Sequence, residues 1–104
     1  MILSDCTGFE WDEASQDKNL VKHNVNWFEA EEIFFNSPLI IDHDKKHSGR
    51  ETRYYALGCT NSDRKLFIVY TIRGTLIRII SARDMNKKES IIYGKEEKRN
   101  TSFQ

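Results

Sequence analysis

The stretch from Lys65 to Arg83 constrains the fold more than any other part of the sequence. It holds two runs rich in β-branched and aromatic residues, Lys65–Arg73 and Leu76–Arg83, separated only by Gly74 and Thr75. Glycine at the first position of a two-residue connection favours a tight hairpin turn, because glycine adopts positive φ without a steric cost. We therefore expect two antiparallel strands here, joined as a hairpin.

The remaining elements are predicted on either side of this hairpin. Alternating or β-branched residues predict further strands at Gly8–Trp11, Leu39–His43 and Arg53–Leu57. Apolar spacing and capping residues predict helices at about Glu13–His23, from Asn26 to Pro38, and at Met85–Tyr93. The order β-α-α-β-β-β-β-α indicates the α+β class: a small, mainly antiparallel sheet with two N-terminal helices and one C-terminal helix, packed on one side.

Length and composition fit one small domain. The 104 residues are near the usual size of a single compact core, and we expect residues 1–94 to form it, followed by a polar, flexible tail at 95–104. No apolar run approaches the roughly 20 residues that a membrane-spanning helix needs. Two distant cysteines, Cys6 and Cys59, are typical of free thiols in a reducing compartment, so we expect a cytoplasmic protein.

Charge is unevenly distributed although the formal net charge is zero. Nine Lys and Arg accompany two acids between Lys45 and Arg83, whereas residues 1–44 hold ten acids and two lysines. The basic stretch could meet a polyanion, and the acidic third is expected to form a solvated helical layer behind the sheet. Arginines on strands would form a rigid phosphate-binding array, and Arg53, Arg78 and Arg83 are the candidates, although each could also be an ordinary surface charge.

Titratable groups stand close to these arginines in the segment 47–53. His47 or Glu51 beside Arg53 would place an acid or a base next to an anion-stabilising group, which phosphodiester cleavage requires. The same basic loop could also bind an RNA backbone without any catalysis. The pattern alone therefore leaves both interpretations open.

A metal site is a further possibility in the segment 42–47, which holds two His and two Asp, including His43 and His47. Lys45 and Lys46 lie between these residues and would repel a cation, and the paired cysteines of a zinc site are absent. We therefore interpret the segment as a charged loop and expect no metal.

The order of residues along the chain, more than its composition, is similar to a known family. The shared landmarks are Phe9-Glu10-Trp11-Asp12, Lys18-Asn19, Lys22-His23, Phe28-Glu29-Ala30, Phe34, Pro38, Asp44-x-x-His47-Ser48, Glu51-x-Arg53, Gly58, Val69-Tyr70-Thr71 and Ile77-Arg78-Ile79-Ile80-Ser81-Ala82-Arg83. This ordered set resembles the BrnT family of type II toxin–antitoxin systems over about Phe9 to Tyr93. One departure is Asn24, where the family usually has glycine; asparagine can adopt the same left-handed helix cap.

The resemblance implies a RelE-like fold and a small toxin that cuts RNA and inhibits translation. It also implies a ribbon-helix-helix antitoxin that neutralises the toxin, with operator DNA bound only through the complex. We expect cleavage without metal or other cofactor, through attack of the ribose 2′-OH on the adjacent phosphate. The candidate catalytic residues are His23, His47, Glu51, Arg53, Arg78 and Arg83. The candidate RNA-binding residues are Lys22, Lys45, Lys46, Arg50 and Arg73.

Two alternatives belong to other functional classes. In the first, the basic face is a non-catalytic module that only docks an antitoxin or RNA. In the second, the chain is a metallohydrolase that uses His43 and His47. Incubation with RNA with and without EDTA separates all three. The metal-independent ribonuclease cuts in both cases, the metallohydrolase cuts only without EDTA, and the binding module never cuts.

Overall fold

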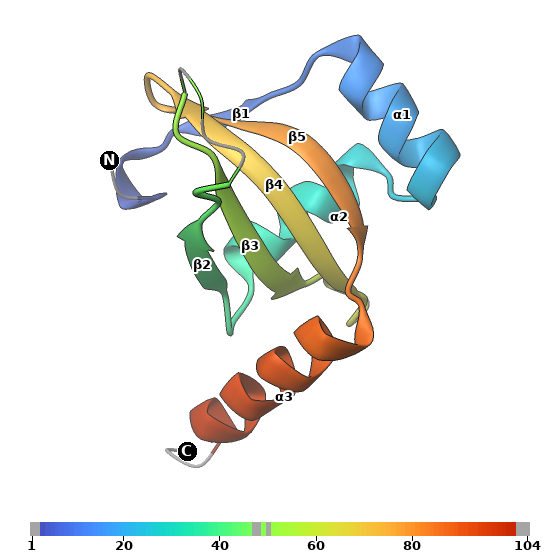
Figure 1. Cartoon of the computed structure of the whole chain (residues 1–104), viewed down its shortest axis with the longest axis vertical. Helices are drawn as coiled ribbons and strands as arrows, with labels where there is room; N and C mark the ends of the chain where they lie inside the picture. The colour runs from blue at the N-terminus through green and yellow to red at the C-terminus, as the bar shows by residue number, and fades with distance from the viewer. Residues whose placement is uncertain (1–2, 47–48, 50, 102–104) are drawn as a thin grey trace.

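The computed structural model describes residues 3–46, 49 and 51–101 and contains one five-stranded sheet (Figure 1). The strands lie in the order β1-β5-β4-β3-β2. They are β1 (Gly8–Glu10), β2 (Ile40–His43), β3 (Tyr54–Cys59), β4 (Lys65–Arg73) and β5 (Leu76–Asp84). The helices are α1 (Glu13–His23), α2 (Trp27–Glu32) and α3 (Lys87–Thr101), with short 3-10 helices η1 (Leu3–Asp5) and η2 (Ile33–Phe35). The predicted element order and α+β class are confirmed.

Every strand pair is antiparallel except β1 with β5, which is parallel. The β4–β5 hairpin turns at Gly74, whose φ of 60° is the positive value that the sequence predicted for this position. The register of this hairpin shifts once, because Val69 pairs with Ser81 while Tyr70 pairs with Ile79. This β-bulge skips one residue of β5, so the two halves of β5 alternate out of phase with each other.

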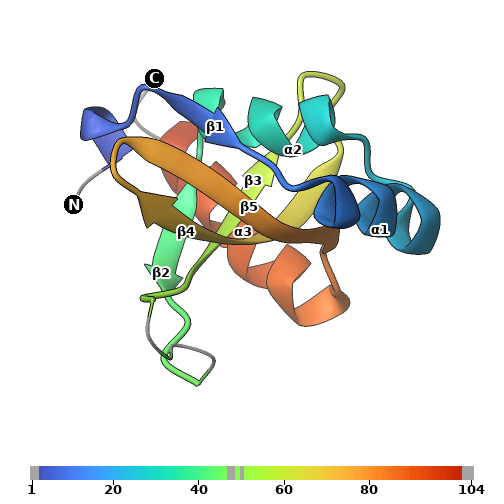
Figure 2. The same ribbon diagram turned by 90° about the horizontal axis from the view of Figure 1, so that it is seen from above.

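The two faces of the sheet differ in what covers them. On one face, Val25, Ala30 and Ile33 pack with fully buried residues of the central strands, among them Ile68 and Ile79. Figure 2 shows α1 and α2 on that side of the sheet. The opposite face carries polar and charged side chains of β4 and β5 and is covered only at one end, by α3. The hydrophobic core therefore leaves one face of the sheet accessible.

The placement of α3 corrects two expectations. Asn86, Glu89 and Ile92 line a hollow against Tyr55 and other residues of the open face, so α3 does not pack on the same side as α1 and α2. The helix also continues beyond the predicted end at Tyr93 and reaches Thr101, through most of the segment expected to be a flexible tail. Residues 102–104 lie outside the described part, and the boundary of the domain at residue 94 stays a prediction.

Tertiary contacts explain why α3 extends so far. The Tyr93 hydroxyl donates a hydrogen bond of 2.6 Å to the carbonyl of Pro38, and Lys65 pairs with Glu97 at 3.4 Å. A polar helix without these contacts would be marginal in water, which is why its sequence reads as a tail. Within the described residues, no helix is long and apolar enough to cross a membrane.

One arginine fastens the end of the sheet to the N-terminal helices. Arg64 donates to the carboxylates of Glu29 and Asp84 and to the backbone carbonyls of His23 and Asn24. We call this set of contacts the Arg64 clasp. Asn24 has a φ of 53°, so it adopts the left-handed conformation expected of the glycine that it replaces. Hydrogen bonds from Arg64 hold the pKa of Asp84 below its ordinary value.

Candidate functional site

A cleft of about 260 Å³ lies on the open face of the sheet, where β4 ends and β5 begins. Seven residues from four separate segments of the chain line it. They are Asp12, Glu51, Arg53, Thr71, Arg73, Arg78 and Ile80. We call this site the arginine cleft, because it gathers three guanidinium groups around two carboxylates.

Backbone pairing and one buried hydroxyl bring these segments together. Thr71 lies opposite Arg78 in the β4–β5 register and is only 2% exposed. Its Oγ1 donates a hydrogen bond of 2.9 Å to the carbonyl of Thr52, which holds the chain between Glu51 and Arg53 against β4. Thr71, Arg73, Arg78 and Ile80 therefore lie on strands, and the connection that carries Glu51 and Arg53 is held to β4 by this hydrogen bond.

Two ion pairs orient arginines in the cleft. Arg78 Nη2 lies 3.1 Å from Asp12 Oδ2, and Arg73 lies 3.0 Å from Glu51 Oε1. Both carboxylates are about half exposed, and ion pairs at such positions contribute only about 0–1 kcal/mol each. An incoming phosphate could therefore share or replace these carboxylates while the guanidinium groups stay in place. With three cations and two anions, the cleft favours a negatively charged ligand.

The structure brings four of the predicted site residues into this cleft: Glu51, Arg53, Arg73 and Arg78. It adds Asp12, which was not among the predicted site residues. The one signal for Asp12 was its place in the Phe9–Asp12 landmark. Because Asp12 belongs to the acidic first third, that region is more than the expected solvated layer behind the sheet.

Arg83 lies at the other end of β5 and is held by other partners. It is five positions from Arg78, which is about 16 Å along a strand. Its guanidinium binds both carboxylate oxygens of Glu89, at 2.8 and 2.9 Å, and lies 4.1 Å from the centre of the Phe67 ring. Burial acts to raise the pKa of Glu89, but hydrogen bonds from Arg83 and the Asn86 backbone outweigh it, so the pKa is lowered.

His23 and Lys22 also lie away from the cleft. They form the last turn of α1, whose first turn follows Asp12, and a helix of 11 residues is about 16 Å long. The backbone carbonyl of His23 accepts a hydrogen bond from Arg64. His23 is thus placed at the Arg64 clasp and not beside the arginines of the cleft.

The remaining predicted residues belong to the connection between β2 and β3. Lys45 and Lys46 are exposed there, and Figure 2 shows this connection projecting on the side of the sheet away from α1 and α2. His47 and Arg50 lie outside the described residues, so their predicted roles have no structural account. The two ends of this connection lie side by side, because the Asp44 N–H donates a hydrogen bond of 2.8 Å to the carbonyl of Arg53. Arg53 itself lines the cleft.

Within the described residues, no three His, Cys, Asp or Glu side chains come together as metal ligands. His43 is exposed and lies edge-on to the ring of Tyr54, with 5.0 Å between centroids. Cys6 and Cys59 are free, as predicted. The metallohydrolase alternative also uses His47, which lies outside the described residues.

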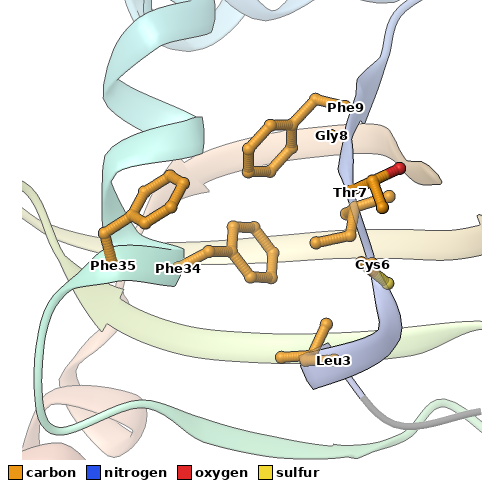
Figure 3. Close-up of a pocket in the computed structure, with 8 residues that line it drawn as sticks. Leu3, Cys6, Thr7, Gly8, Phe9, Phe34 and Phe35 are labelled. Carbon is orange, nitrogen blue, oxygen red and sulfur yellow. The ribbon is translucent and has the colours of Figure 1, made fainter. Parts of the chain in front are cut away.

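Figure 3 shows an apolar hollow of about 190 Å³ that is separate from the arginine cleft and lies between η1, β1 and η2. The Phe34 and Phe35 rings lie 5.7 and 6.0 Å from that of Phe9, and Phe35 is 78% exposed. Among the described residues, no charged side chain lines this hollow. It therefore differs from the arginine cleft, which is lined by three arginines.

Comparison with known proteins connects this geometry to a family. The model of the family described as ribonuclease toxin BrnT of type II toxin–antitoxin systems matches residues 11–89. The chain belongs to this family. The predicted resemblance is thus confirmed, and the chain is a ribonuclease toxin whose family has an antitoxin partner. The matched range includes every residue of the arginine cleft and ends at Glu89.

The solved structures support the fold. The 1.1 Å crystal structure of the Brucella abortus ribonuclease toxin BrnT matches with a TM-score of 0.59 and 18% sequence identity. The match covers 78% of this chain and 99% of that one. At this identity the likeness establishes the shared fold, with which the predicted RelE-like architecture is consistent. No curated protein matches the sequence.

Proposed function

We propose that this toxin is an endoribonuclease that cuts RNA in the arginine cleft without a metal ion. The observation that carries the proposal is the presence of Glu51, Arg53, Arg73 and Arg78 in one accessible cleft. Phosphoryl transfer of this kind needs a base near the nucleophile and fixed positive charge where negative charge develops. The cleft supplies both within a single small volume.

The reaction uses the 2′-OH of the RNA as its nucleophile. The carboxylate of Glu51 takes the 2′-OH proton, and the 2′ oxygen then forms a bond to the adjacent phosphorus. Arg53 and Arg78 bind the phosphate oxygens and stabilise the charge of the transition state, while Arg73 orients Glu51. The bond from phosphorus to the 5′ oxygen breaks, and that oxygen receives a proton from an acid. The products are a 2′,3′-cyclic phosphate and a 5′-hydroxyl end.

We propose His47 as the acid, since it is a predicted catalytic residue and belongs to the connection that precedes Glu51. A His47→Gln variant tests this role through the pH–rate profile. Loss of the limb that falls with rising pH supports a proton-donating histidine, and an unchanged profile assigns the acid elsewhere.

The decisive experiment is cleavage of a structured RNA by the purified toxin in excess EDTA. We expect cleavage to continue and to leave 2′,3′-cyclic phosphate ends. Binding without cleavage would instead support the non-catalytic module. Cleavage that stops with EDTA and returns with a divalent cation would support a metallohydrolase.

The partner proposal follows from the charge of the cleft. We propose a cytoplasmic ribbon-helix-helix antitoxin that neutralises the toxin by covering the cleft, and that carries the complex to operator DNA. Because RNA and antitoxin would then compete for one surface, added antitoxin should raise the apparent KM for RNA before cleavage is lost. Inhibition that leaves KM unchanged would place the antitoxin elsewhere.

A further inference from the structure

A second hollow on the open face of the sheet has a different chemistry from the arginine cleft. It measures about 540 Å³ and lies between the sheet and α3. Tyr55, Leu57 and Phe67 line it from the sheet, and Ile92 lines it from α3. This size falls within the usual range of about 300–1,000 Å³ for pockets that bind small organic groups.

The hollow suits a flat, uncharged group better than a phosphate. The rings of Tyr55 and Phe67 are stacked, with 5.7 Å between centroids and 24° between planes, so they present parallel π surfaces. Asp44, Lys88 and Glu89 also line the hollow, and Glu89 is paired with Arg83, so the lining has no excess of positive charge that would favour a phosphate. Asn86 Oδ1 accepts a hydrogen bond from the Glu89 N–H, which orients the Asn86 amide at the start of α3. This amide and the Asp44 carboxylate supply groups of the kind that read the edges of a nucleobase.

The hollow is also placed where a neighbouring nucleotide would reach it. Tyr55 follows Arg53 of the cleft by two residues, and alternate residues of an extended segment lie on one face, about 7 Å apart. The Asp44 N–H donates to the carbonyl of Arg53, so both sites share the same pair of segments. A strand whose phosphate binds the cleft therefore has an adjacent base within reach of the hollow.

We propose that this hollow is a base pocket, which binds a nucleobase beside the scissile phosphate and sets the sequence preference of cleavage. The inference rests on the proposed function, because it takes the arginine cleft as the phosphate site. The bidentate contact between Arg83 and Glu89 fixes the first turn of α3 over Phe67 and so keeps the pocket open. Arg83 is in this view a positioning residue for base recognition.

Direct binding is tested on the full-length wild-type toxin by NMR. The probes are the four nucleoside 5′-monophosphates, with ribose 5-phosphate as the control that lacks a base. We expect at least one nucleotide to shift the amide signals of Asn86, Lys88 and Ile92, and ribose 5-phosphate to leave them unchanged. Equal shifts with ribose 5-phosphate would overturn the base pocket. Shifts with the antitoxin but with none of the four nucleotides would also overturn it and assign the surface to that partner.

Cleavage is tested with two neighbouring substitutions on α3. Ile92→Trp fills the pocket, whereas Ile91→Trp adds the same side chain at an exposed position that does not line it. We expect Ile92→Trp to lower kcat/KM on RNA by about 10- to 100-fold and to flatten the base preference at the cut sites, consistent with base stacking worth about 1–3 kcal/mol. Ile91→Trp should match the wild type. Equal cut-site preferences in all three proteins would overturn the inference.

The two proposals fail in different ways. Nucleotide-specific shifts without RNA cleavage would retain the base pocket and remove the proposed nuclease function. Cleavage that is indifferent to Ile92→Trp would retain the nuclease and remove the pocket. Circular dichroism of both α3 variants checks that they fold, and the NMR titration needs no variant.

Discussion

Arginines at the two ends of the β4–β5 hairpin have different surroundings. In the arginine cleft, Arg78 and Arg73 each pair with a carboxylate that is about half exposed. In the Arg64 clasp, a single guanidinium donates to two carboxylates and two backbone carbonyls. The hydrogen bonds raise the pKa of Arg64 above its ordinary range. The comparison teaches that the number of partners, more than the charge, separates an arginine that can receive a ligand from one that fastens the fold.

The largest expected effect is the loss of cleavage when the cleft is altered. Glu51→Gln should lower kcat by about 10²- to 10⁴-fold, because it removes the proposed base. Arg78→Ala should cost about 10²- to 10³-fold, because it removes one transition-state donor. Neither change should shift the unfolding midpoint by more than a few degrees. Single-turnover cleavage and thermal unfolding of each variant measure the two effects, and wild-type rates in both would break the assignment of the cleft.

The next largest effect is a loss of stability when the Arg64 clasp is removed. Arg64→Met should lower the free energy of unfolding by about 2 kcal/mol, since Glu29 and Asp84 would lose their shared partner in a partly buried setting. Cleavage below the new unfolding midpoint should stay near the wild-type rate. Urea unfolding provides the measurement, with Arg99→Met on α3 as the control. An Arg64→Met protein that is as stable as the wild type but inactive would contradict the assignment of stability to the Arg64 clasp and of cleavage to the arginine cleft.

Arg83 provides a sharper test, because it was predicted as catalytic and is held by Glu89 and Phe67. Arg83→Ala should cost about 1 kcal/mol of stability through the lost ion pair and ring contact. It should lower cleavage by about tenfold or less and relax the base preference. A loss of kcat as large as that of Arg78→Ala, with the base preference intact, would instead place Arg83 in direct contact with the phosphate.

The smallest effect is the response of stability to acid. The pKa values of Asp84 and Glu89 are lowered below their ordinary values of 3.8 and 4.5, so both carboxylates stabilise the fold when ionised. This contribution is present above those ordinary values and is lost as the pH falls through the lower folded values. Unfolding midpoints measured from pH 6 to pH 3 should therefore fall less steeply in Arg64→Met. If the unfolding midpoint depended on pH equally in both proteins, the pairing with Arg64 would not lower the pKa of Asp84.

Much of the fold could be predicted from local patterns. The β4–β5 hairpin follows from two strand-forming runs and a glycine at the turn, and the structure has Gly74 at positive φ. Helix α1 begins and ends where its charges and caps predict, at Glu13 and His23. These features depend on residues close together in sequence, so tertiary packing did not override them. The C-terminal end of α3 was mispredicted because it depends on the distant contacts of Tyr93 and Glu97.

The sequence by itself determined the family, the element order and the residue types of the cleft. Only the tertiary structure decided which charges meet. Strict alternation along β5 would put Arg78 and Arg83 on opposite faces, and the bulge at Ile80 brings both to the open one. Asp12 pairs with Arg78, which is 66 residues away in the sequence. Arg83 pairs with Glu89 and does not line the cleft. A periodicity of two is a local property of a strand, whereas a register shift and an ion pair depend on what the neighbouring segments place opposite it.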